Sequence, residues 1–86
     1  QLTEEQESTL AGLGFKKTTT RVPSTAPRGL VDVEQWIMND SRKNYILTVR
    51  YFTNQVHQVR LFDLNDELDV STTLDKLVDT LEEYIK

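Results

Sequence analysis

Residues 45–64, YILTVRYFTNQVHQVRLFDL, decide the fold of this chain. Two runs rich in aliphatic and aromatic residues, Tyr45–Thr53 and Val56–Leu64, lie on either side of a polar turn. Such runs are typical of β-strands joined as an antiparallel hairpin. Within the turn, Asn54 is the residue best suited to a positive φ. The stretch therefore predicts two paired strands.

Side chains along a strand alternate between two faces, so the turn length assigns them. With Thr53–Gln55 as the turn, Phe52 pairs with Val56. The first face is then apolar and offers a floor for a helix: Tyr45, Leu47, Val49, Tyr51, His57, Val59 and Leu61, extended by Val31, Val33 and Ile37. The second face mixes apolar and polar residues: Trp36, Met38, Ile46, Phe52, Val56 and Phe62 with Thr48, Arg50, Gln58 and Arg60. A turn shorter by one residue would mix the two sets.

The N-terminal half predicts a helix, a loop and a further strand. Thr3 and Gln6 have the spacing of a capping box, which predicts a helix over residues 4–12 that ends at the following glycines. Residues 15–22 are β-branched enough for an edge strand. Two prolines make residues 22–29 a loop, and residues 30–38 alternate as a strand.

Helical spacing is clearest at the C-terminus. Ser71 or Thr72 is expected to cap a helix that runs to the end of the chain, with this apolar stripe: Leu74, Leu77, Val78, Leu81, Tyr84 and Ile85. The resulting order is helix, three or four strands, helix. We therefore expect residues 1–86 to form one two-layer α+β domain, with an antiparallel meander and the C-terminal helix on the first face.

Composition argues against most catalytic and metal chemistry. The chain has no cysteine and a single histidine, His57, so thiolate and multi-histidine sites are excluded. No nucleophile motif or glycine-rich phosphate loop is present. We expect no enzyme, metal or cofactor. No apolar run approaches the ~18 residues that a membrane span needs, so we expect a cytoplasmic protein that makes no membrane contact.

Charge is segregated along the chain, whose net charge is −4. Residues 1–15 hold three acids and no base, residues 16–62 hold eight bases against three acids, and residues 63–86 hold eight acids against two bases. On the C-terminal helix an acidic stripe follows one flank: Asp75, Asp79, Glu82 and Glu83. The stripe predicts a small regulatory, inhibitor-like module that binds a protein with a basic surface. An alternative is that it imitates nucleic-acid phosphates and inhibits a DNA-binding protein.

The second sheet face supports other partners. Five of its residues are typical of interfaces: Trp36, Arg50, Phe52, Arg60 and Phe62. They could contact a protein, form a homodimer, or stack the bases of a single-stranded nucleic acid. The expected element order is also that of the double-stranded-RNA-binding domain, as an analogy of topology only. Residues 70–77, which would carry its basic cluster, have one lysine beside the acidic Asp75, so the electrostatic attraction is missing.

Overall fold

A computed structural model describes residues 1–18, 20–40, 43–64 and 68–85. The elements, in chain order, are α1 (Glu4–Leu13), β1 (Lys16–Thr18), β2 (Leu30–Asn39), β3 (Asn44–Phe52), β4 (Gln58–Asp63), β5 (Leu68–Thr73), the short 3₁₀ helix η1 (Leu74–Lys76) and α2 (Leu77–Tyr84). The strands form one antiparallel sheet in the order β1-β2-β3-β4-β5. The predicted α+β class is confirmed, although the sheet has five strands rather than three or four.

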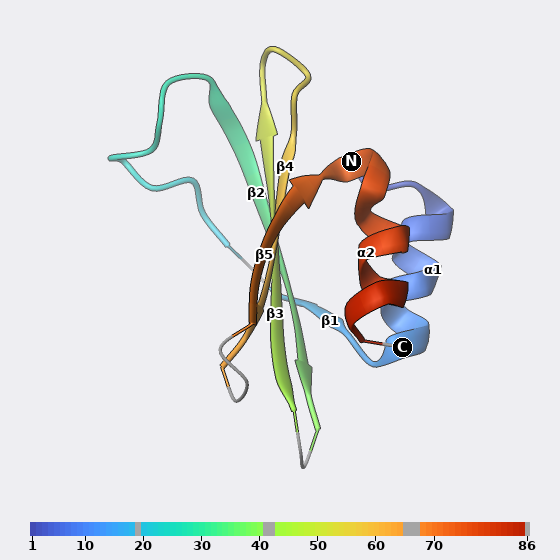
Figure 1. The fold of residues 1–86 in the computed structure, drawn as a ribbon. Coiled ribbons are helices and arrows are strands. Elements are labelled where there is room, and N and C mark those ends of the chain that lie inside the picture. Colours follow the sequence, from blue (N-terminus) through green and yellow to red (C-terminus); the bar gives the residue numbers. More distant parts are fainter. Residues whose placement is uncertain (19, 41–42, 65–67, 86) are drawn as a thin grey trace.

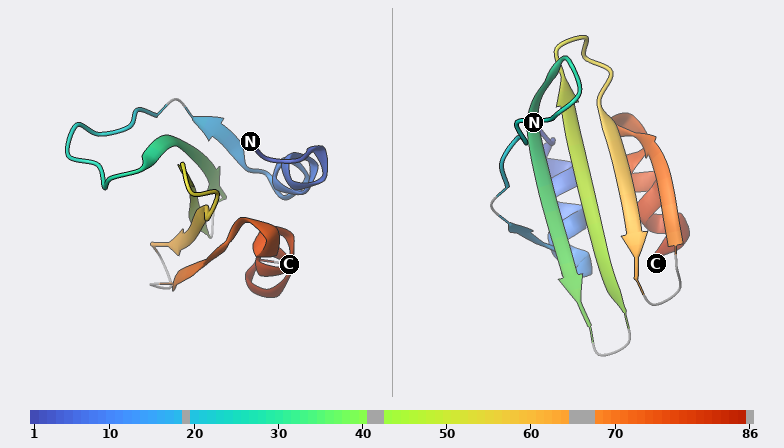
Figure 2. Two further views of the ribbon diagram at one scale, coloured as in Figure 1. Left: turned by 90° about the horizontal axis from the view of Figure 1, so that it is seen from above. Right: turned by 90° about the vertical axis from the view of Figure 1, so that its left-hand side faces the viewer.

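Both helices lie on one side of the sheet, which curves around them (Figures 1 and 2). Leucines from the two helices meet the inner face of the central strands, where Leu10, Leu77 and Leu81 are fully buried. The facing strand residues are equally inaccessible: Tyr45, Leu47, Val49, Val59 and Leu61. The apolar surface predicted to pack against the C-terminal helix is therefore present in β3 and β4.

The predicted register of the central hairpin is confirmed. Val49 pairs with Val59 and Arg50 with Gln58, which places position 52 opposite position 56. The ladder nevertheless stops early, because β4 begins only at Gln58. The positive φ of 67° falls on Gln55 rather than on Asn54. Asn54 instead accepts a hydrogen bond from the backbone N–H of Val56 at 3.0 Å.

The assignment of β2 to the two faces was wrong. Trp36 pairs with Leu47 and Met38 with Tyr45, so both belong to the buried inner face. Ile37, expected on the inner face, pairs instead with Ile46 on the uncovered side. Both alternating sets of β2 contain apolar residues, so the strand's own pattern leaves the phase undecided. The phase follows from the pairing of Asn39 with Asn44 across the connection, which puts the larger side chains into the core.

The expected start of the C-terminal helix was also wrong. Residues 68–73 form the edge strand β5, and α2 begins only at Leu77, after η1. Ser71 and Thr72 lie in this strand, paired with Arg60 and Val59 of β4. The β-branched sequence of Val70–Thr73 suits a strand, and pairing with it extends the sheet beyond β4.

The N-terminal capping box is confirmed. The side chain of Thr3 accepts from the N–H of Gln6 at 3.1 Å, and the side chain of Gln6 accepts from the N–H of Thr3 at 2.9 Å. At the other end, Gly14 adopts φ 100° and caps the helix. A second bond from Gln6 joins the two helices, since its Nε2 donates to the carbonyl oxygen of Leu74 at 2.9 Å. The amide side chain therefore fixes α1 against the start of the C-terminal helical segment.

Candidate functional site

The helical segments α1, η1 and α2 carry several exposed carboxylates, and we call this set the acidic layer. In Figure 1 α1 and α2 lie side by side, on the side of the sheet away from the 20–29 loop. The layer consists of seven exposed carboxylates: Glu4, Glu5, Glu7, Asp75, Asp79, Glu82 and Glu83. Within the described helices, Lys76 is the basic residue of this layer. The fold thus joins the predicted C-terminal stripe to the glutamates of the opposite chain end.

Two carboxylates of the acidic layer have a local structural role. The side chain of Thr73 and the backbone N–H of Asp75 itself donate hydrogen bonds that lower the pKa of Asp75. Asp79 lies in the first turn of α2, where the positive end of the helix dipole favours an anion. Both residues therefore help the chain to leave β5 and begin a helix.

Glu82 and Glu83 have no comparable role at the start of the helix. They lie in the last turn of α2, which holds no basic residue in the described chain. Carboxylates near a helix C-terminus face the negative end of the dipole and destabilise the helix slightly. Their side chains are exposed, so packing does not require them either. Among the described residues, neither the helix dipole nor packing favours these two carboxylates.

The uncovered side of the sheet, which we call the open face, holds four of the five predicted sheet-face residues. Arg50, Phe52, Arg60 and Phe62 alternate outward, whereas Trp36 is buried on the inner face. The prediction that Trp36 belongs to this surface was wrong, because Trp36 pairs with Leu47 of β3 and shares its inner face. A groove of about 800 Å³ on this side is lined by residues of β3, β4 and β5, including Arg50 and Arg60.

Internal contacts occupy much of the open face. Arg60 forms a bidentate ion pair with Asp69, at 2.8 Å from Nε to Oδ1 and 2.7 Å from Nη2 to Oδ2. The pair lowers the pKa of Asp69 and raises that of Arg60. The guanidinium carbon of Arg60 also lies 4.9 Å from the centre of the Phe62 ring. Arg60 is therefore held by two neighbours rather than directed at a ligand.

The two open-face phenylalanines are too far apart to stack adjacent bases. Phe62 pairs with Ile46, six residues before Phe52 along β3. Six strand residues span about 20 Å. With Trp36 in the core, the continuous aromatic platform expected for a single-strand binder is not formed. A homodimer through the open face stays a prediction.

A buried carboxylate, that of Glu34, lies on the helix-covered side of the sheet. Glu34 is buried on the inner face, where it accepts from Tyr51 Oη at 3.0 Å and from Trp36 Nε1 at 3.3 Å. Lys17 Nζ lies 3.9 Å from the same carboxylate. Burial and the hydrogen bond to Glu34 raise the pKa of Tyr51. Glu34 accepts two hydrogen bonds and lies near one lysine, and these contacts are those of a structural group.

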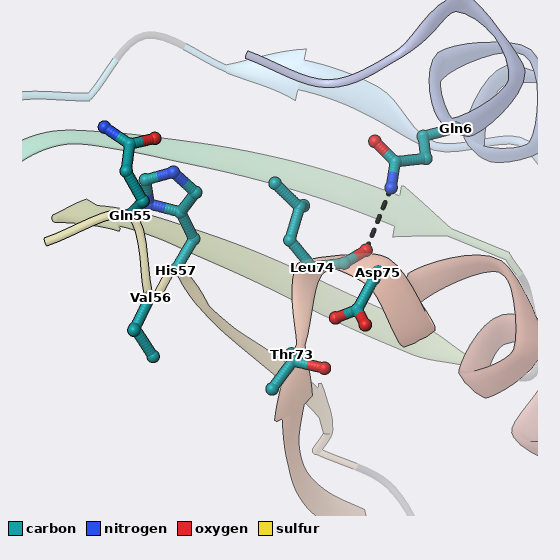
Figure 3. Close-up of a pocket in the computed structure, with 7 residues that line it drawn as sticks. All are labelled: Gln6, Gln55, Val56, His57, Thr73, Leu74 and Asp75. Carbon is teal, nitrogen blue, oxygen red and sulfur yellow. Dashed lines mark hydrogen bonds between the residues drawn. The ribbon is translucent and has the colours of Figure 1, made fainter.

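A pocket of about 470 Å³ lies between the first turn of α1, the β3–β4 turn and the junction of β5 with η1 (Figure 3). His57 lines it, and its Nδ1 accepts the backbone N–H of Phe52 at 3.0 Å. The His57 ring also packs edge-on against Tyr51, with 5.1 Å between ring centres. Gln6, in the same wall, is bonded to Leu74. These groups hold the hairpin and helix in place, and the contacts of His57 are those of a structural residue.

Within residues 1–18, 20–40, 43–64 and 68–85, no three potential metal-ligating side chains gather. The helices of these same ranges are too short and too polar to cross a bilayer. No protein-family model matches the chain, and no curated protein or solved structure matches it.

Proposed function

We propose that this protein is a small, non-enzymatic binding module whose acidic layer docks on the basic surface of a partner protein. The observation that carries the proposal is the side-by-side packing of α1 and α2, which unites acids from both ends of the chain (Figure 1). Such a module would act as a regulatory, inhibitor-like protein. We propose the cytoplasm as its location, as expected from the sequence.

The electrostatics of the layer suit this role. Seven carboxylates stand against Lys76 on the described helices, so the layer carries a strongly negative potential. A surface of one sign accelerates encounters with an oppositely charged partner and repels wrong ones. Glu82 and Glu83 add to this potential although the helix dipole disfavours them at their positions.

The test compares capture of a partner from the native host by the wild type and by a triple variant, Asp79→Lys, Glu82→Lys and Glu83→Lys. Asp75 is left unchanged because its carboxylate is bonded at the start of η1. Capture should weaken more than about tenfold in this variant, because like charges facing each other cost several kcal/mol. Association of the wild type should also slow as salt is raised.

A matched control reverses three bases away from the helices, with Lys16→Glu, Arg21→Glu and Arg50→Glu. This variant should keep the wild-type partner. If the triple lysine variant captures the partner as well as the wild type does, the proposal is wrong. Where the captured partner binds DNA, competition by duplex DNA separates imitation of phosphates from docking elsewhere on the partner.

A further inference from the structure

The two edges of the sheet differ in how they are protected against further strands. At one edge, β1 has three residues, and two of them are the lysines Lys16 and Lys17. The hydroxyl groups of Thr18 and Thr20 also donate to carbonyl oxygens of β2. Short length, lysines and occupied carbonyl groups are devices that prevent pairing at an edge.

The opposite edge, β5, has none of these devices. It is six residues long and contains neither lysine nor proline. Its charged residue, Asp69, is bonded to Arg60 on the open face. Among the described residues, no loop or turn backbone group is bonded to Leu68–Thr73. Alternate N–H and C=O groups of an edge strand point away from the sheet, so those of β5 are available to another strand.

The inner face near this edge is incompletely covered. Leu61 and Val59 of β4 are 0% and 1% exposed, whereas their β5 partners Val70 and Thr72 remain half-exposed. In the right-hand view of Figure 2, β5 forms the margin of the molecule, with α2 behind it. A further strand would shield these side chains as well as pair the backbone.

We propose that β5 is extended by a strand from the partner, and that this strand is an extended segment rich in lysine or arginine. The choice of a basic segment rests on the proposed function, because α2, which carries Asp79, Glu82 and Glu83, lies behind this edge (Figure 2). Asp75 is exposed two residues past the end of β5, and α2 follows it. Strand addition of this kind draws affinity from main-chain hydrogen bonds and specificity from alternate side chains.

A second copy of this chain is a poorer occupant of the same edge. Antiparallel pairing of two β5 strands about a two-fold axis would place both helical layers on one side of the joined sheet. The α2 helices would then be neighbours, with Asp79, Glu82 and Glu83 of each copy close to those of the other. Like charges in such an arrangement disfavour the dimer.

The test uses a blocked peptide of alternating lysine and valine, about as long as β5, added to the isotope-labelled full chain. Nuclear magnetic resonance should show contacts between peptide and β5, and slower hydrogen exchange at outward-pointing β5 amides. Methylating alternate peptide nitrogens, which removes main-chain donors but keeps the charge, should weaken binding by about tenfold or more. An alternating glutamate–valine peptide should bind much more weakly still.

Two matched protein variants locate the contact. Ser71→Lys places a charge on the edge strand, and Thr48→Lys places the same charge two strands away in the same cross-strand row. Both positions face the uncovered side, so the core is preserved. Ser71→Lys should weaken peptide binding several-fold more than Thr48→Lys.

The outcomes separate this inference from the proposed function. If the lysine peptide fails to bind at millimolar concentration, or binds equally well after methylation, the edge is not a docking site, whatever the acidic layer does. If exchange slows at β5 but the triple variant Asp79→Lys, Glu82→Lys and Glu83→Lys binds the peptide as the wild type does, strand addition holds. The acidic layer is then not what selects the peptide.

Discussion

The Nε2 atom of Gln6 donates a hydrogen bond to the carbonyl oxygen of Leu74, 68 positions along the chain, at 2.9 Å. The same side chain closes the capping box of α1. One amide therefore satisfies a helix N-terminus and joins the two helical segments that carry the acidic layer. Its loss should affect both.

Replacing Gln6 with alanine should lower the free energy of unfolding by about 1–3 kcal/mol, because the partly buried carbonyl of Leu74 loses its donor and the capping box is broken. Chemical denaturation followed by circular dichroism measures the change. Ser8→Ala, at an exposed position of α1, is the control and should change stability by no more than about 0.5 kcal/mol. Equal stabilities of the two variants would contradict the structural role of Gln6.

Trp36→Ala should destabilise the protein by about 3–5 kcal/mol, since the indole is buried beneath the sheet. For a small domain this is a large part of the total stability. Because Trp36 is the single tryptophan, blue-shifted fluorescence of the wild type should report its burial directly. Ile37→Ala, one position along and half-exposed on the open face, should cost clearly less. A solvent-like emission spectrum would show that the indole is on the surface instead.

Tyr51→Phe should change both stability and its dependence on alkaline pH. Burial and the bond to Glu34 raise the folded pKa of Tyr51 above the ordinary value of 10.0. Stability from this group is therefore present below pH 10 and is lost as pH rises further. The variant should lose part of that alkaline dependence. It should also be about 1–3 kcal/mol less stable at neutral pH, because Glu34 loses a donor. If the free energy of unfolding of both proteins fell equally as pH rises above 10, this prediction would be contradicted.

Asp75→Asn should reduce the loss of stability in acid. Hydrogen bonds from Thr73 and from its own backbone lower the folded pKa of Asp75 below 3.8. The carboxylate therefore stabilises the fold above about pH 4, and this contribution disappears as pH falls through the lower folded pKa. Thermal unfolding measured from pH 6 downwards should show the two proteins converging. Asp79→Asn, in the first turn of α2, serves as the comparison.

Glu82→Lys with Glu83→Lys should raise stability while it weakens partner binding. Each change places a cation at the negative end of the α2 dipole, which contributes about 0.3–1 kcal/mol at low salt. Thermal unfolding and partner capture measure the two effects on the same protein. A variant that is stabilised and still binds fully would assign these glutamates no role in docking.

Local patterns were sufficient for the elements whose signals lie close together in sequence. The capping box of Thr3 and Gln6 predicted where α1 begins, and the spacing of Leu77 and Leu81 predicted the buried face of α2. The register of the central hairpin followed from a short connection, because few residues separate its strands. In each case the interactions that select the structure are nearly local.

Patterns that fit two structures equally well were decided by pairing. β2 has apolar residues on both faces, so only its ladder with β3 places Trp36 inside and Ile37 outside. Residues 71–73 suit a strand or the beginning of a helix, and the neighbouring strand β4 selects the strand. Sequence analysis therefore misplaced one residue of the candidate sheet surface and missed the edge strand altogether.

By itself, the sequence determined the α+β class, the inner face of the central hairpin, and the presence of acids at both ends of the chain. Tertiary structure alone decided that these ends lie next to each other, because α1 and α2 share a single face of the sheet and Gln6 bonds to Leu74. It also left β5 as the less protected edge. The physical reason is that charge and hydrogen-bonding groups act across space, and their neighbours are set by packing rather than by distance along the chain.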